Sequence, residues 1–125
     1  MKLVDTSSWI EYLRDRASEA GDAVEVLVLS GEAAWCGMTL VELWHGVRGA
    51  KEKRDLAEME KEIEHVPVDA EVWRLARKLA LRAWEKGFTV PVSDIVTAAC
   101  ATVHGLELEH CDKHFDDLLP LAKAL

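Results

Sequence analysis

The chain has 125 residues, of which 50% are hydrophobic and 30% charged, and its formal net charge is −8. This is the composition of an ordinary globular domain with enough residues to bury a core, and it excludes collagen-like and low-complexity chains. No apolar run approaches the roughly 20 residues needed to span a bilayer. The start of the chain has no signal-peptide core, and three scattered cysteines are typical of a reducing compartment. The sequence therefore predicts a single cytoplasmic domain, residues 1–125, with no membrane association.

The first half of the chain alternates between short apolar runs and amphipathic segments. Ser8 and Glu11 have the spacing of a helix capping box, as do Thr39 and Glu42. The predicted elements are a strand at 2–5, a helix ending near 16, a helix at 19–29, a strand at 33–37, a helix from 39 and a charged amphipathic helix at 51–64.

The second half continues the alternation. The predicted elements are an extended piece at 65–68, a long helix at 69–86 capped by Asp69, a helix at 93–104, a strand at 106–111, a loop and short helix at 112–118, and an extended end after Pro120. Strands that alternate with helices in this way predict an α/β fold, in which a mainly parallel sheet carries helices on its faces. Sites in such sheets form beyond the carboxyl ends of the strands.

Four acidic residues stand at element ends and could converge at that edge: Asp5, Glu42, Asp94 and Asp112. Each has a simpler explanation. Asp5 could belong to a turn at the end of a strand, and Glu42 could complete a capping box. Asp94 could interact with a helix dipole, and Asp112 could be an ordinary loop carboxylate. Together, however, four carboxylates raise one another's pKa values unless cations neutralise them. Hard divalent metals such as Mg²⁺ and Mn²⁺ prefer such oxygen ligands, and a pair of them can promote attack of water on a phosphodiester.

The net negative charge by itself argues against nucleic-acid binding, because phosphate contacts require Lys and Arg. Bound divalent cations would reverse the local charge where a phosphate must sit. Two basic groups could also contact RNA, or could equally form solvated helix faces with Glu–Lys pairs, and the sequence leaves both readings open. These groups are Arg48, Lys51, Lys53 and Arg54, and, at helical spacing, Arg74, Lys78 and Arg82.

Other chemistries find less support. Cys100 and His104 precede a stretch with two further histidines, His110 and His114, but their spacing fits no common closed zinc site. No Gly-x-Ser-x-Gly element, nucleophile–base pair or phosphate-binding glycine loop is present. The five tryptophans could stack on bases, but most fall on predicted helices beside other apolar residues, which favours core or dimer contacts.

Four motifs, in order along the whole chain, resemble those of the PIN-domain ribonucleases of the VapC toxin family. In the first motif, a strand is followed by Asp5, by Thr and Ser residues and by an amphipathic helix. In the second, Glu42 is followed four residues later by Gly46. The third is Asp94 opening an Ala-rich helix. The fourth is Asp112 shortly before Phe115, although His110 and Cys111 stand where many relatives have Thr or Ser.

The resemblance implies a PIN-like three-layer sandwich with a central, mainly parallel sheet of four or five strands between helices. It implies a Mg²⁺-dependent endoribonuclease, with Mn²⁺ as a substitute, whose metal ligands and catalytic residues are Asp5, Glu42, Asp94 and Asp112. Thr6 and Asp116 would support them. Water activated at the metal would attack the phosphate in line and leave 5′-phosphate and 3′-hydroxyl ends.

The expected partners are an RNA substrate, a VapB-type antitoxin and a second copy of the chain in a homodimer. The apolar faces of the helices between Thr39 and Glu64 are the proposed dimer contacts. Two alternatives stay open: a non-catalytic PIN-like module that binds nucleic acid or protein, and a metal-dependent DNase.

Overall fold

The computed structural model describes residues 1–125 and has the α/β architecture that the alternation predicts. Its elements are β1 (Lys2–Val4), α1 (Thr6–Arg14), α2 (Glu19–Leu29), β2 (Ala33–Cys36), α3 (Gly37–His45), α4 (Gly49–Glu62), β3 (Glu64–Val66), α5 (Ala70–Glu85), α6 (Val92–Val103), β4 (Glu107–Glu109) and α7 (His114–Lys123). None of the helices combines the length and apolar character needed to cross a membrane.

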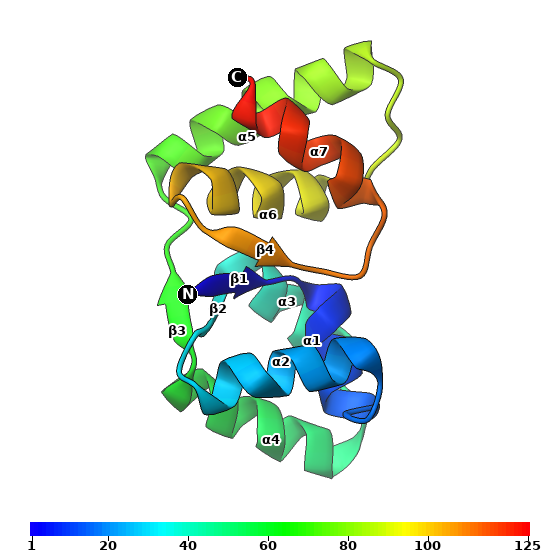
Figure 1. Ribbon diagram of the computed structural model, residues 1–125, viewed down its shortest axis with the longest axis vertical. Helices are drawn as coiled ribbons and strands as arrows, with labels where there is room; N and C mark the ends of the chain where they lie inside the picture. The colour runs from blue at the N-terminus through cyan, green and yellow to red at the C-terminus, as the bar shows by residue number, and fades with distance from the viewer.

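The sheet has four strands in the order β3-β2-β1-β4, and every pairing is parallel. Leu3 at the centre of β1 pairs with Ala34 on one side and Leu108 on the other. Helices α5, α6 and α7 lie on one face, and α1, α2 and α4 lie on the other (Figure 1). The predicted three-layer arrangement is therefore confirmed.

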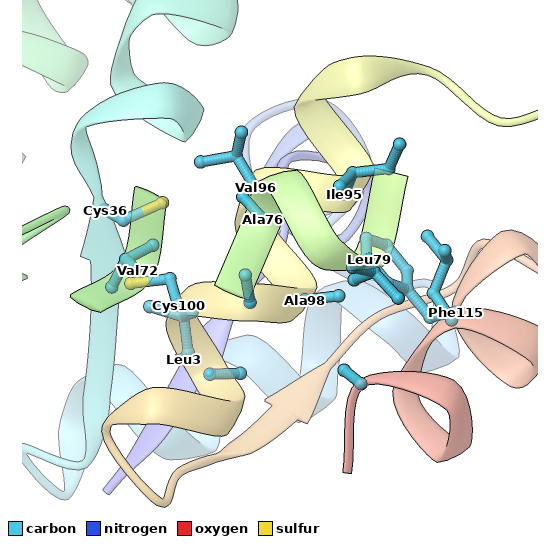
Figure 2. Packing of buried hydrophobic residues seen from close by; sticks show 14 of the residues in the cluster. Leu3, Cys36, Val72, Ala76, Leu79, Ile95, Val96, Ala98, Cys100 and Phe115 are labelled. Carbon is cyan, nitrogen blue, oxygen red and sulfur yellow. The ribbon is translucent and has the colours of Figure 1, made fainter. Parts of the chain in front are cut away.

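Alternation along the central strands divides the core into two clusters, one on each face of the sheet. Leu3 and Cys36 point into the larger cluster with side chains of α5, α6 and α7, among them Cys100 and Phe115 (Figure 2). Val4 and Trp35 belong to the smaller cluster with Trp9, Val24 and Leu56. Because successive side chains of a strand face opposite ways, three or four residues per strand are enough to serve both layers.

The first predicted capping box is wrong. Asp5, not Ser8, caps α1: its carboxylate accepts hydrogen bonds from the backbone N–H of Ser7 at 3.1 Å and from the Ser7 hydroxyl at 2.8 Å. The helix therefore begins directly after the strand, and Ser8 is fully buried inside it with no hydrogen-bond partner for its hydroxyl.

The second predicted capping box is also wrong. Helix α3 begins at Gly37, so Thr39 is buried within it, and Glu42 lies in its second turn instead of its first. Glu42 accepts its hydrogen bond from Thr6 on α1, not from its own helix.

The end of the chain is helical, although Pro120 favoured an extended segment. Pro120 lies inside α7 and removes one backbone donor. Phe115 and Leu118 before it, and Ala122 after it, are all buried against the sheet layer. Their packing outweighs the lost hydrogen bond, which is why local propensity mispredicts this segment.

The predicted cap of α5 is confirmed, because the Asp69 carboxylate accepts a hydrogen bond from the backbone N–H of Val72 at 3.1 Å. Asp69→Ala leaves this donor without its partner, and we expect a loss of about 1 kcal/mol, or about 4 °C in Tm. Thermal unfolding followed by circular dichroism measures the change. Asp69→Asn, which keeps a capping oxygen, is the matched control, and equal loss in both variants would contradict the capping role.

Candidate active site

Three helices begin at the edge of the sheet where β1 and β4 end. Asp5 caps α1, Asp94 lies in the first turn of α6, and Asp112 lies two residues before the start of α7. Figure 1 shows these helix starts on the same side of the molecule. Helix N-termini carry partial positive charge, so this edge stabilises anions, both the carboxylates themselves and an approaching phosphate.

Asp5 is fixed to the β4–α7 loop as well as to α1. The Ser7 hydroxyl donates to Asp5 Oδ2 and accepts from the backbone N–H of Cys111 at 3.3 Å. The backbone N–H of Asp5 also donates to the carbonyl of Glu109 at 2.9 Å. These bonds hold the first carboxylate in register with the loop that carries Asp112.

Glu42 reaches the same edge from α3. The Thr6 hydroxyl donates to its Oε1 at 2.7 Å, and the negative charge of Glu42 is close enough to raise the pKa of Asp5. Thr6 thus orients Glu42 beside Asp5.

Asp94 and Asp112 meet around His114. Asp94 is only 7% exposed, and its Oδ2 lies 2.8 Å from His114 Nδ1. Asp112 Oδ1 lies 3.1 Å from the same nitrogen and accepts a hydrogen bond from the His114 backbone N–H at 3.0 Å. Ligand atoms of these three residues all lie within 4.8 Å of one another.

The carboxylates at this edge are not neutralised by Lys or Arg. Burial raises the pKa of Asp5, whereas the hydrogen bonds from Ser7 lower it. Burial also raises the pKa of Asp94, and the charges of Asp5 and Asp112 add to it, while the hydrogen bond from His114 lowers it. Both carboxylates are thus buried near other negative charges, and a bound cation would stabilise their ionised forms.

In the metal-free protein, we expect Asp94→Asn to lower the pKa of His114. The hydrogen bond to Asp94, with added attraction from Asp112 and Asp117, raises that pKa above its usual range. The protonated ring therefore stabilises the fold below about pH 6.5, and this contribution is lost as the pH rises through the raised value. Proton NMR of the imidazole signals against pH, in the wild type and in the variant, measures the shift. An unchanged His114 titration would contradict the interaction.

The structure therefore brings Asp5, Glu42, Asp94 and Asp112 to one edge, together with Thr6. The side chain of Asp116 is exposed and makes no hydrogen bond or ion pair, whereas the charge of its neighbour Asp117 acts on His114. Sequence reasoning did not assign Ser7 to the site, and it considered His114 only as a candidate zinc ligand. The only available signal was their spacing, each two residues after a candidate carboxylate.

The chemistry of these side chains fits a divalent cation. Carboxylate oxygens are the ligands that Mg²⁺ and Mn²⁺ prefer, and buried acids with raised pKa values gain from a cation among them. The fit is tightest at Asp94, Asp112 and His114, whose ligand atoms already converge.

The side chains that could contact nucleic acid, which are basic residues and tryptophans, differ in their surroundings in the structure. Lys51 pairs with Asp55, Arg74 with Glu71, and Arg82 lies 3.9 Å from Glu85, as in a solvated helix face. Trp9 and Trp35 are fully buried and pack together, which excludes them from base stacking, whereas Trp73 and Trp84 on α5 are exposed.

Comparison with known proteins places this site in a family. The PIN domain model matches residues 2–118. Ribonuclease VapC11 of Mycobacterium tuberculosis is 35% identical over 122 residues, which cover 93% of this chain and 90% of the relative.

Among solved structures, VapBC2 from Rickettsia felis, bound to a promoter DNA fragment, superposes with a TM-score of 0.77 at 16% identity, covering 96% of this chain and 93% of the other. VapBC-5 from Mycobacterium tuberculosis superposes with a TM-score of 0.68 at 25% identity, covering 94% and 89%. Matches of this extent, in sequence and in fold, establish that the chain belongs to the VapC family of PIN-domain proteins.

Proposed function

We propose that residues 1–125 form a single PIN domain that acts as a metal-dependent endoribonuclease, the toxin of a VapBC-type toxin–antitoxin pair. The observation that carries the proposal is the gathering of Asp5, Glu42, Asp94 and Asp112 at the carboxyl edge of the sheet. The names of the curated relatives, which are ribonucleases, supply the substrate class.

Asp5, Glu42, Asp94 and Asp112 would hold the cation, Mg²⁺ or Mn²⁺. When bound, such an ion supplies Lewis-acid chemistry and neutralises charge that develops on the phosphoryl oxygens. The chain's own residues do the positioning: Thr6 orients Glu42, and Ser7 orients Asp5 and fixes the Asp112 loop to it. The N-termini of α1, α6 and α7 favour a phosphate at this edge. No side-chain nucleophile is needed.

Cleavage of end-labelled RNA by the purified protein tests the proposal. We expect cutting with Mg²⁺ or Mn²⁺ and none with EDTA, with 5′-phosphate ends on the products. Cleavage that persists in EDTA would refute the metal-dependent mechanism. Cutting of single-stranded DNA but not of an RNA of the same sequence would identify a DNase, and absence of Mn²⁺ binding would favour the non-catalytic module.

An antitoxin partner is part of the same proposal. Both solved structures described above are VapBC assemblies. The concentration of carboxylates at the sheet edge suits an inserted Arg or Lys side chain, since charge complementarity steers such contacts. Added antitoxin should inhibit the cleavage measured above.

A homodimer is supported by an exposed apolar face that includes α3, one of the helices that the sequence suggested. The apolar side of α4 is used internally, because Leu56 is fully buried. An exposed apolar cavity of about 340 Å³ lies instead between α3, α5 and α6. Val41, 67% exposed, and Trp73, 44% exposed, line it and form a face that association would bury.

Val41→Asp should shift the protein from dimer to monomer, because a charge would be buried without a partner in the interface. Sedimentation velocity at tens of micromolar protein measures the change. Val26→Asp on α2, at a site 59% exposed, is the matched control and should leave the dimer intact. A monomeric wild-type protein at these concentrations would refute the homodimer.

A further inference from the structure

The spacing of His114 from the other histidines and the cysteines fits no common zinc site, yet the structure places His114 among the carboxylates. Its Nδ1 lies 2.8 Å from Asp94 Oδ2 and 3.1 Å from Asp112 Oδ1. Asp94 comes from α6 and Asp112 from the β4–α7 loop, so the ring stands at the junction of two elements.

These separations are those of neighbouring ligands around a small octahedral ion. Bonds of about 2.0–2.1 Å at right angles place adjacent donor atoms about 3 Å apart. One cation could therefore contact Asp94 Oδ2, Asp112 Oδ1 and His114 Nδ1 with little movement of any of them, because all three atoms already lie within 4.8 Å of one another.

The backbone holds the ring in this place. His114 is the first residue of α7, and its N–H donates to Asp112 Oδ1 at 3.0 Å. Phe115, the next residue, is fully buried in the larger core cluster and anchors the start of the helix. The imidazole is thus presented to the carboxylates by the fold, in contrast to exposed His45.

We propose that His114 Nδ1, after releasing to solvent the proton that it shares with Asp94, is a direct ligand of the divalent cation. As a ligand, it shifts the preference of the centre from Mg²⁺ towards Mn²⁺ and the later first-row metals. The proposal rests on the metal-dependent function proposed above. Mg²⁺ strongly prefers oxygen ligands, whereas an imidazole nitrogen suits transition metals, whose affinity rises from Mn²⁺ towards Cu²⁺. A purely carboxylate centre would discriminate less between Mg²⁺ and these metals.

Electron spin echo spectroscopy of the Mn²⁺-loaded protein tests the ligand directly, without reference to activity. A coordinated imidazole nitrogen gives a characteristic modulation, which must change when histidine carries the heavy nitrogen isotope. We expect this modulation in the wild type and in His110→Gln, and its loss in His114→Asp. Asp suits the first turn of α7, so this variant should fold and still bind Mn²⁺. Its preference for Mn²⁺ over Mg²⁺, measured by calorimetry, should fall by about tenfold.

The outcomes separate the two proposals. Mn²⁺ binding with no histidine modulation would overturn the role of His114 and leave the carboxylate centre standing. Modulation that persists in His114→Asp would likewise overturn it, by assigning the nitrogen to another residue. If wild-type protein binds no Mn²⁺, the metal-dependent function itself fails, and the ligand role fails with it.

Discussion

Asp94→Asn will reduce RNA cleavage by roughly a thousandfold while leaving the fold intact. Asp94 is 7% exposed and lies between the charges of Asp5 and Asp112, so its carboxylate is central to any cation held there. Asparagine has nearly the same volume, and its amide oxygen still accepts a hydrogen bond from His114. The substitution therefore removes the charge and little else.

Initial rates on labelled RNA at saturating Mn²⁺ measure the loss, and circular dichroism verifies the fold. Asp69→Asn is the matched control, because it makes the same chemical change at a helix cap away from the sheet edge. It should cleave at the wild-type rate. A folded Asp94→Asn variant that also cleaves at the wild-type rate would refute the proposed site.

Asp5→Asn will reduce RNA cleavage about as much as Asp94→Asn does. In the metal-free protein, however, it will increase the stability of the fold. Burial raises the pKa of Asp5, so the folded state binds a proton more tightly than the unfolded state does. At pH 7 the ionised Asp5 therefore costs stability, which a neutral Asn recovers. Asn also retains most of the capping ability of Asp. We expect a gain of about 1 kcal/mol, or about 4 °C in Tm.

The pH dependence of the gain in stability distinguishes removal of the buried charge of Asp5 from improved packing. The gain should be complete above the raised pKa of Asp5 and should vanish below about pH 4, where Asp5 is protonated in both states. Thermal unfolding in EDTA across this range measures it. Excess Mn²⁺ should reverse the order of stability, because wild-type protein gains about 2.7 kcal/mol at one hundred times the Kd and the variant gains less. A lower Tm for the metal-free variant at pH 7 would contradict the argument.

The sequence was sufficient to predict the order of the elements and the edge at which the acids meet. Asp5 directly follows β1, Asp112 lies three residues after the end of β4, and parallel strands bring their carboxyl ends together. Asp94 opens a helix at the same edge. These placements depend on local pattern and topology, which one sequence contains.

Other features depend on contacts between distant residues and were not predictable in this way. Glu42 accepts its hydrogen bond from Thr6, which is 36 residues away, instead of completing a local cap. Pro120 is held in a helix by buried side chains on either side of it. His114 joins the carboxylates only because α7 begins where it does. In each case tertiary packing overrides the local signal.

The pairing of the first strand with the last has a consequence for biosynthesis. β1 lies between β2 and β4, and the hydrogen bond from Cys111 to Ser7 spans 104 residues. A chain still emerging from the ribosome has Asp5 and Glu42 but lacks both the fourth strand and the Asp112 loop. The complete centre can therefore form only after the chain has been synthesised beyond Asp112 and β4 has paired with β1, so a shorter nascent chain lacks the site.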